Sequence, residues 1–169
     1  ASRFSSKPDR QRIFKSLTEL LKNILHKPGK RGLVVPFEYQ AGKFIIFSDQ
    51  HRGGKNGSDD FRQAEPNYMA ALDYYSAGDF CFINLGDSEE LWENRLWKVK
   101  RKNKITFQAE KKFIDHNKYI KLFGNHDLFW DNDPLARWHL KDIFGEKVEI
   151  YEGVVLPTVI GEKELTIFC

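Results

Sequence analysis

The middle of the chain contains three short, largely apolar runs, at residues 44–47, 80–83 and 119–123. A run that is apolar on both faces is typical of a buried strand in a parallel sheet. Helical patterns lie between the runs, so the order is strand, helix, strand, helix, strand. This order predicts an α/β fold with right-handed crossover connections.

Segments with helical spacing complete the pattern. Residues 9–26 predict an amphipathic helix with Asp9 as its N-cap, ended by a Pro-Gly pair at 28–29. Its apolar stripe, which we expect to pack on a core rather than on a membrane, consists of Ile13, Leu17, Leu20, Leu21, Ile24 and Leu25. We expect Pro66 in the first turn of the next helix and Gly78 at its end. Further helices are predicted at 91–102, 107–115 and 134–144, and strands at 148–156 and 164–169.

Composition excludes several classes of protein. The hydrophobic content of 41% excludes a disordered chain, and 27 basic against 24 acidic residues exclude a polycation that wraps nucleic acid. Two cysteines exclude a disulfide framework and a cysteine-based zinc module. No apolar run reaches the ~18 residues of a membrane helix, and no signal peptide is visible. We therefore expect a cytoplasmic protein without a transmembrane segment.

Each predicted strand runs directly into polar residues. The three motifs are Asp49-x-His51, Gly86-Asp87 and Gly124-Asn125-His126-Asp127. The carboxyl ends of parallel strands meet at one edge of the sheet, so these side chains should converge there. Carboxylate, amide and imidazole ligands together suit Mn, Fe, Zn or similar divalent ions. Two ions about 3.5–4 Å apart, bridged by Asp87, would clamp a phosphate and activate a water.

Each motif alone has a simpler interpretation. Asp49 and His51 could be ordinary polar residues at the surface. A Gly-Asp pair such as Gly86-Asp87 occurs by chance in many proteins. The segment 124–127 could be an ordinary strand-to-helix turn with a capping Asn or Asp. That interpretation does not explain His126. Three such motifs, each after an apolar strand, favour the metal site.

Taken together, the motifs resemble the calcineurin-like metallophosphoesterase superfamily. The resemblance implies a four-layer β-sandwich flanked by helices, in which a hydroxide held between two divalent metals hydrolyses phosphomonoesters or phosphodiesters. It implies that Asp49 and His51 bind the first metal, that Asp87 bridges both, and that Asn125 binds the second. His126 would sit by the leaving group, paired with Asp127.

The residues within and around the motifs are loosely similar to those of the UDP-2,3-diacylglucosamine pyrophosphohydrolase group. Ser48 precedes Asp49-x-His51, and an acidic-aromatic segment follows Gly86-Asp87. Members of that group often have Arg where this chain has His126. We expect a phosphorylated small molecule, a lipid-linked compound or a nucleotide as the substrate.

The resemblance covers residues 43–169 and implies the N-terminal portion of such a domain, with residues 1–30 as a helical extension. The family uses three further histidine ligands, and no histidine follows His139 here. We therefore expect the chain by itself to bind metal poorly and to hydrolyse nothing. A catalytically inactive binding domain of the same fold is an alternative.

Charged segments raise a further alternative. Arg52 and Lys55 lie in a Gly-rich loop after the first motif and could bind a substrate phosphate, or the loop could simply be solvated. Ten Lys or Arg residues between 95 and 121 could form an electropositive wall, which would favour a nucleic-acid phosphodiesterase. Four tryptophans could either pack in the core, stack on a base or line an acyl groove: Trp92, Trp97, Trp130 and Trp138.

Overall fold

The computed structural model describes residues 9–57 and 59–169 and has mixed α/β structure. The chain divides into two compact units, which we call the terminal unit and the central unit. The terminal unit comprises residues Ala1–Ala41 and Tyr151–Cys169, and the central unit comprises Gly42–Ile150. Of the predicted extension 1–30, residues 1–8 lie outside the described residues. None of the helices in the described ranges is long and apolar enough to cross a membrane.

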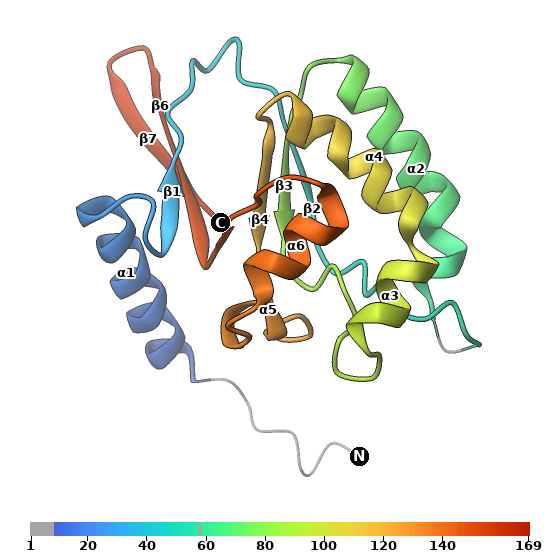
Figure 1. Ribbon diagram of the computed structural model, residues 1–169. Helices are drawn as coiled ribbons and strands as arrows, with labels where there is room; N and C mark the ends of the chain where they lie inside the picture. The colour runs from blue at the N-terminus through green and yellow to red at the C-terminus, as the bar shows by residue number, and fades with distance from the viewer. Residues whose placement is uncertain (1–8, 58) are drawn as a thin grey trace. The chain divides into compact units, whose positions relative to one another are not determined.

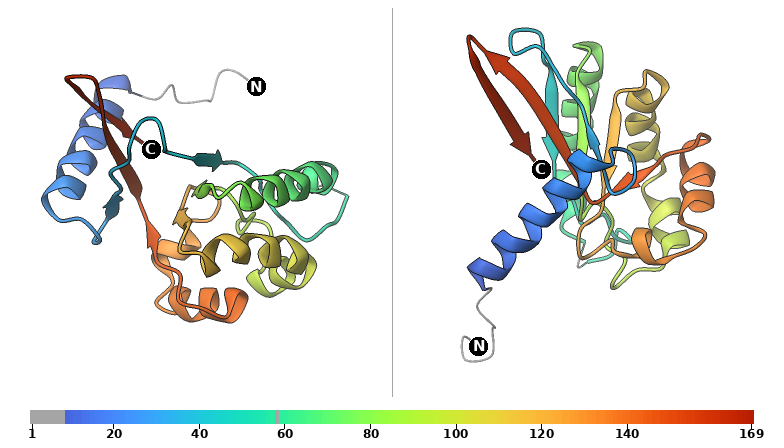
Figure 2. Two further views of the ribbon diagram at one scale, coloured as in Figure 1. Left: turned by 90° about the horizontal axis from the view of Figure 1, so that it is seen from above. Right: turned by 90° about the vertical axis from the view of Figure 1, so that its left-hand side faces the viewer.

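The terminal unit is a three-stranded sheet with one helix. Parallel β1 (Gly32–Val34) and antiparallel β7 (Lys163–Phe168) flank β6 (Gly153–Ile160). Helix α1 (Arg10–His26) lies alongside β1 and β6 (Figure 2). This division differs from the predicted boundary at residue 43, because backbone pairing of β1 with β6 joins the N-terminal segment to the C-terminal hairpin.

The predicted start of α1 is confirmed. The carboxylate of Asp9 accepts hydrogen bonds from the backbone N–H groups of Gln11 and Arg12, at 2.9 and 3.3 Å. The predicted apolar stripe is buried only at Ile24; Ile13 and Leu17 remain 44% and 49% exposed. Ile24 is buried because it packs directly against Gly32, where a Cβ would lie 2.4 Å from its Cδ1.

We predict that Asp9→Ala destabilises the terminal unit by about 1 kcal/mol, because two N–H groups of the first turn lose their acceptor. Thermal unfolding followed by circular dichroism measures this cost. Asp9→Asn, which keeps a side-chain acceptor, should recover most of it. Equal melting of Asp9→Ala and the parent chain would contradict the capping role.

The central unit contains the three predicted strands, and their parallel pairing is confirmed. β2 (Phe44–Phe47), β3 (Cys81–Leu85) and β4 (Tyr119–Leu122) are neighbours in a sheet of order β2-β3-β4-β5, with β5 at Ile150–Tyr151. Ile45 is in register with Phe82, and Ile83 with Ile120. This register aligns the carboxyl ends of the three strands and so brings the loops that follow them to one edge.

Helices α2 (Phe61–Ala77) and α4 (Lys104–Asp115) cover one face of this sheet (Figure 1). The core between them contains Ile45, Phe61, Tyr68, Leu72, Phe82, Ala109 and Phe113. A second cluster joins α4 to α3 (Leu96–Lys102), α5 (Phe129–Asn132) and α6 (Ala136–Phe144). These two clusters fix the elements from which the site loops emerge.

Helices α2 and α3 begin furthest from their predicted positions. Pro66 is not in the first turn of α2, because the buried side chain of Phe61 extends the helix five residues earlier; Pro66 therefore supplies no N–H to the carbonyl of Arg62. Residues 91–95 are not helical, and α3 begins only at Leu96. The predicted end of α6 is confirmed, because Gly145 adopts a left-handed φ of 79° and caps the helix.

Candidate metal centre

The loops after β2 and β3 continue side by side beyond the strands. Their pairing ends in an isolated parallel bridge between Arg52 and Glu89. Backbone hydrogen bonds join the loops from Asp49 N to Gly86 O at 3.3 Å, from His51 N to Asp87 O at 2.9 Å, and from Arg52 N to Ser88 O at 3.0 Å. The Asp49-x-His51 and Gly86-Asp87 motifs are therefore held together by their own backbone.

Three of the predicted ligands have strained backbones. Asp49, His51 and Asp87 adopt positive φ values of 58°, 46° and 50°. Side chains disfavour this left-handed region, at a cost on the order of 1–3 kcal/mol per residue, and it persists only where the surrounding structure enforces it. The paired loops supply that enforcement. Strain of this kind concentrates at functional sites, which supports a site at this edge.

Two glycines let the second and third motifs approach closely. Gly86 has φ of 88°, and a Cβ there would lie 2.6 Å from the backbone N of Gly124. A Cβ on Gly124 would lie 2.3 Å from Oδ1 of Asp87. The same oxygen accepts a hydrogen bond from the backbone N–H of His126 at 2.6 Å. Asp87 is thus fixed by the loop that carries the third motif.

The first predicted metal ligands are brought together. Asp49, His51 and Asp87 each offer a ligand atom, and these atoms lie within 4.8 Å of one another. Nε2 of His51 lies 3.7 Å from Oδ1 of Asp49, whose side chain is 67% exposed. Two carboxylates and one imidazole fit a borderline divalent ion such as Mn, Fe or Zn. Asn125 is exposed on the loop after β4, next to His126.

Glu90 is a site residue that the sequence did not single out. Its Oε2 lies 3.2 Å from Nδ1 of His51 and 2.7 Å from Nδ1 of His126, so one oxygen contacts both rings. A ring whose Nδ1–H donates to a carboxylate presents the Nε2 lone pair to a metal or a proton. Burial opposes the charged form of Glu90, but the hydrogen bonds from His51 and His126 outweigh it and lower the pKa of Glu90.

His126 is also fixed by aromatic contacts. The ring of Trp92 stacks on it, with centroids 4.0 Å apart and planes 26° apart. The ring of His51 meets it edge-on at 4.3 Å. Trp92 is itself 65% exposed, so it covers His126 at the surface. The roles predicted for the tryptophans did not include the stacking of Trp92 on His126.

The predicted pairing of Asp127 with the His126 ring is wrong. The Asp127 carboxylate accepts hydrogen bonds from the backbone N–H groups of Gly124 and Asp87 through Oδ1, at 2.6 and 3.2 Å. Its Oδ2 accepts from the N–H of Ser88 at 3.0 Å and lies 3.2 Å from the Ser88 hydroxyl oxygen. Burial raises the pKa of Asp127. Asp127 therefore joins two site loops, and Glu90 takes the place predicted for it beside His126.

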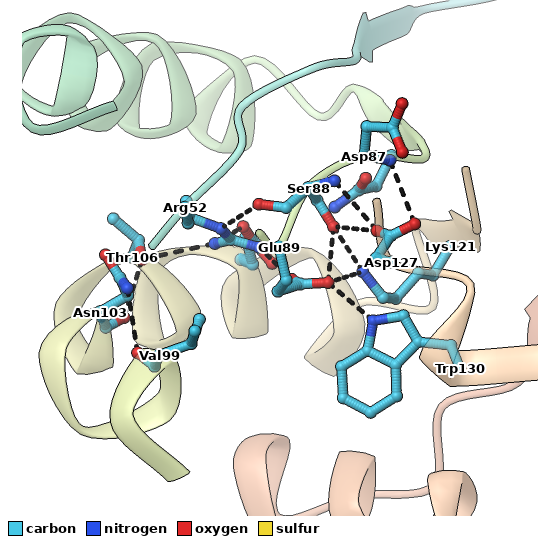
Figure 3. Close-up of polar contacts among 12 residues, drawn as sticks. Arg52, Asp87, Ser88, Glu89, Val99, Asn103, Thr106, Lys121, Asp127 and Trp130 are labelled. Atoms are coloured by element: carbon cyan, nitrogen blue, oxygen red, sulfur yellow. Dashed lines mark hydrogen bonds and ion pairs between the residues drawn. The ribbon is translucent and has the colours of Figure 1, made fainter. Parts of the chain in front are cut away.

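The prediction that Arg52 binds a substrate phosphate is also wrong, because its side chain is fully buried. Figure 3 shows its guanidinium among residues from several elements, where it donates to Glu89 at 2.6 Å and to Thr106 at 3.3 Å and pairs with Glu110. Burial opposes its charge, but the adjacent Glu110 and Glu89 outweigh that effect and raise the pKa of Arg52. Arg52 is a core ion-pair residue that anchors the loop after β2.

Glu89 is the centre of this buried network. Its Oε2 accepts from Lys121 at 2.9 Å, from the indole N–H of Trp130 at 2.8 Å, and from the hydroxyl of Ser88 at 2.8 Å. Burial alone would raise the pKa of Glu89, but the charges of Lys121 and Arg52 outweigh it and lower the pKa to about 2. The network connects the motif loops to β4, α4 and α5.

The remaining basic residues are partly neutralised. Nζ of Lys55 lies 2.6 Å from both carboxylate oxygens of Glu65, so this ammonium already has a protein partner. Several cations of the 95–121 segment also pair with acids, among them Lys111, Lys112 and Lys118. The predicted electropositive wall is therefore interrupted.

A cavity of about 810 Å³ adjoins the site and is lined by Asp49, His51 and Glu90. Its other acidic lining residues are Asp59, Asp60 and Glu93, and no Lys or Arg of the described residues lines it. The cavity therefore suits a divalent cation and offers an anion no cationic side chain. A phosphate here would rely on bound metal for charge neutralisation.

In a longer protein that contains this chain, we predict that Glu90→Ala weakens Mn²⁺ binding about 10–100-fold, because His51 loses the acceptor that orients its ring. Isothermal titration calorimetry measures the affinity. Glu93→Ala is the matched control, since Glu93 lines the same cavity and is exposed. Equal effects of the two substitutions would show that Glu90 contributes only general negative charge.

Comparison of the chain with family models, with curated proteins and with solved structures finds no match.

Proposed function

We propose that this chain carries the first ligands of a two-metal phosphoesterase site of the calcineurin-like type. The observation that carries the proposal is the convergence of Asp49, His51 and Asp87, whose ligand atoms lie within 4.8 Å of one another after two parallel strands. The strained backbone at all three residues supports it further. In this proposal the fold is of the phosphoesterase kind, a β-sandwich flanked by helices.

Each residue has a distinct role in the proposal. Asp49 and His51 would hold a first ion, Asp87 would be shared with a second, and Asn125 from the adjacent loop would contribute to the second. When bound, such ions lower the pKa of a water and neutralise charge on the phosphoryl oxygens. His126 is oriented by Glu90 and Trp92, and in its doubly protonated form it would give the Nε2 proton to the departing oxygen of the ester while Nδ1–H stays bonded to Glu90.

The substrate in this proposal is a phosphomonoester, a phosphodiester or a pyrophosphate. Since Arg52 is buried and Lys55 is paired, neither supplies a phosphate contact. The cavity beside the site has room for the group attached to the phosphate. The resemblance implies three further histidine ligands that this sequence lacks, so turnover is proposed for a protein in which those ligands are present.

Asp87→Asn tests the proposal. In a longer protein that contains this chain, we expect Mn²⁺-dependent hydrolysis of a chromogenic phosphodiester, and Asp87→Asn should lower turnover at least ~100-fold because the bridging charge is lost. Asp79→Asn is the matched control, since Asp79 also has a positive φ of 65° but lies in the turn before β3.

Two outcomes would contradict the proposal. Unchanged turnover in Asp87→Asn would exclude Asp87 as a bridging ligand. Tight metal binding without hydrolysis of any phosphate ester would favour the alternative of an inactive binding domain.

A further inference from the structure

A second cavity of the central unit has a different character. It measures about 720 Å³ and is lined by residues of α3, α4, α5 and α6. Its aromatic lining residues are Trp97, Phe107, Phe129 and Trp138. Phe107 belongs to the buried core and forms part of the cavity's apolar base. Its volume falls within the range of about 300–1,000 Å³ for small-molecule sites.

The two tryptophans at this cavity are exposed. Trp97 and Trp138 have 56% and 61% of their surfaces accessible, although each stands on a helix that is packed by the second core cluster. Large aromatic rings on a fixed surface provide flat faces for stacking at low entropic cost. Exposed rings beside a cavity therefore favour a ligand with a planar apolar part.

Positive charge accompanies these rings. Lys100, Arg101 and Lys104 line the cavity against a single acidic residue, Asp142, which pairs with Lys100. Neither Arg101 nor Lys104 forms an ion pair with any residue in ranges 9–57 and 59–169. Cζ of Arg101 lies 5.2 Å from the centroid of the Trp97 ring. Unpaired charge next to an aromatic face suits a ligand that is both anionic and aromatic.

We propose that this cavity binds a nucleotide, free or as one unit of a single strand. The base stacks on Trp97 or Trp138, and the phosphate pairs with Arg101 and Lys104. Base stacking on aromatic side chains tolerates any base, and Lys and Arg supply the phosphate contacts. An acyl chain would leave the two cations without a partner, and a free phosphate would leave the rings without one.

A hollow shares lining residues with this cavity and with the aromatic contact at His126. It is lined by Leu91–Leu96 and Phe129, and it shares Leu96 and Phe129 with the nucleotide cavity. Trp92, which stacks on His126, is also part of it. A single strand seated in the cavity would lie along this hollow, whereas a free mononucleotide would not occupy it. Strand length therefore distinguishes the two sources of the ligand.

The test is calorimetric titration of the 169-residue chain with UMP and with an oligothymidylate of about ten nucleotides. The titrations contain EDTA, so that no metal contributes to binding. We expect Trp138→Ala and Arg101→Glu each to weaken binding about tenfold, with affinity falling as salt rises. Tighter binding of the oligothymidylate than of UMP would identify a strand, and equal binding a free nucleotide.

Two matched controls separate the site from general effects. Lys102→Glu makes the same change of charge on α3 at an exposed residue that does not line the cavity. Tyr74→Ala removes an aromatic ring, 72% exposed, from α2. Both should bind like the parent chain.

The proposal is overturned if Arg101→Glu and Lys102→Glu weaken binding equally, or if Trp138→Ala has no effect while its circular dichroism spectrum matches that of the parent. It is also overturned if neither nucleotide probe binds, or if laurate binds with an affinity that does not depend on salt.

Discussion

Glu89→Ala is expected to lower the free energy of unfolding by about 3–5 kcal/mol. Removing this carboxylate takes from the fully buried Arg52 one of the two acids with which it pairs among the described residues, and it breaks the ion pair of Lys121. A buried charge without a partner is far costlier than a lost surface contact. Urea unfolding followed by circular dichroism measures the change.

The matched control is Lys112→Ala, which breaks an ion pair between Lys112 and Asp73 whose side chains are 55% and 59% exposed. That pair should contribute about 0–1 kcal/mol. The stabilisation by Glu89 should also depend on pH, because only the ionised carboxylate pairs with Arg52 and Lys121. Its pKa is lowered from 4.5 to about 2, so its stabilisation is complete above about pH 4.5 and is lost as the pH falls toward 2. A Glu89→Ala chain as stable as the Lys112→Ala chain would contradict the role of the network.

Gly86→Ala is expected to destabilise the central unit by about 2–5 kcal/mol and, in a longer protein that contains this chain, to abolish metal binding. The new methyl group has to enter a backbone with φ of 88° and would lie 2.6 Å from the backbone N of Gly124. Relief of this overlap requires the loops of the second and third motifs to separate. Asp87 would then lose its fixed place. Urea unfolding and Mn²⁺ titration measure the two effects.

Gly145→Ala controls for the cost of the positive φ alone. Gly145 has a φ of 79°, and a Cβ there would meet only Cε of Lys111 at 3.9 Å. We expect a cost of about 1–2 kcal/mol and unchanged metal binding. If both glycine substitutions had the same effect on stability and metal affinity, close approach of the two loops would not be required.

The strands and their chemistry could be predicted from sequence because their signals are local. Each apolar run contains its own evidence of burial, and each is followed at once by polar side chains. Parallel pairing then brings Asp49, His51 and Asp87 together without further information. The N-cap at Asp9 is equally local, since the donors lie two and three residues away.

The roles of charged residues could not be predicted in the same way. Arg52 stands in a Gly-rich loop that looks solvated, and its burial depends on Glu110, which is 58 residues further along the chain. Asp127 follows His126 directly, yet its oxygens turn toward the backbone of the preceding motif. Glu90 and Glu89 are adjacent in sequence, but one reaches the site histidines and the other enters the core. Only the folded structure shows that these two glutamates have different roles.

The long sequence separations within the Arg52 network also bear on the order of folding. Its guanidinium contacts groups that are 36, 37, 54 and 58 residues away. The entropy of closing such loops has to be overcome before any of these contacts stabilises the chain. We therefore expect the loop that carries Asp49 and His51 to become ordered only once β3 and α4 have docked, so that the ligand geometry forms late, as a product of the assembled core.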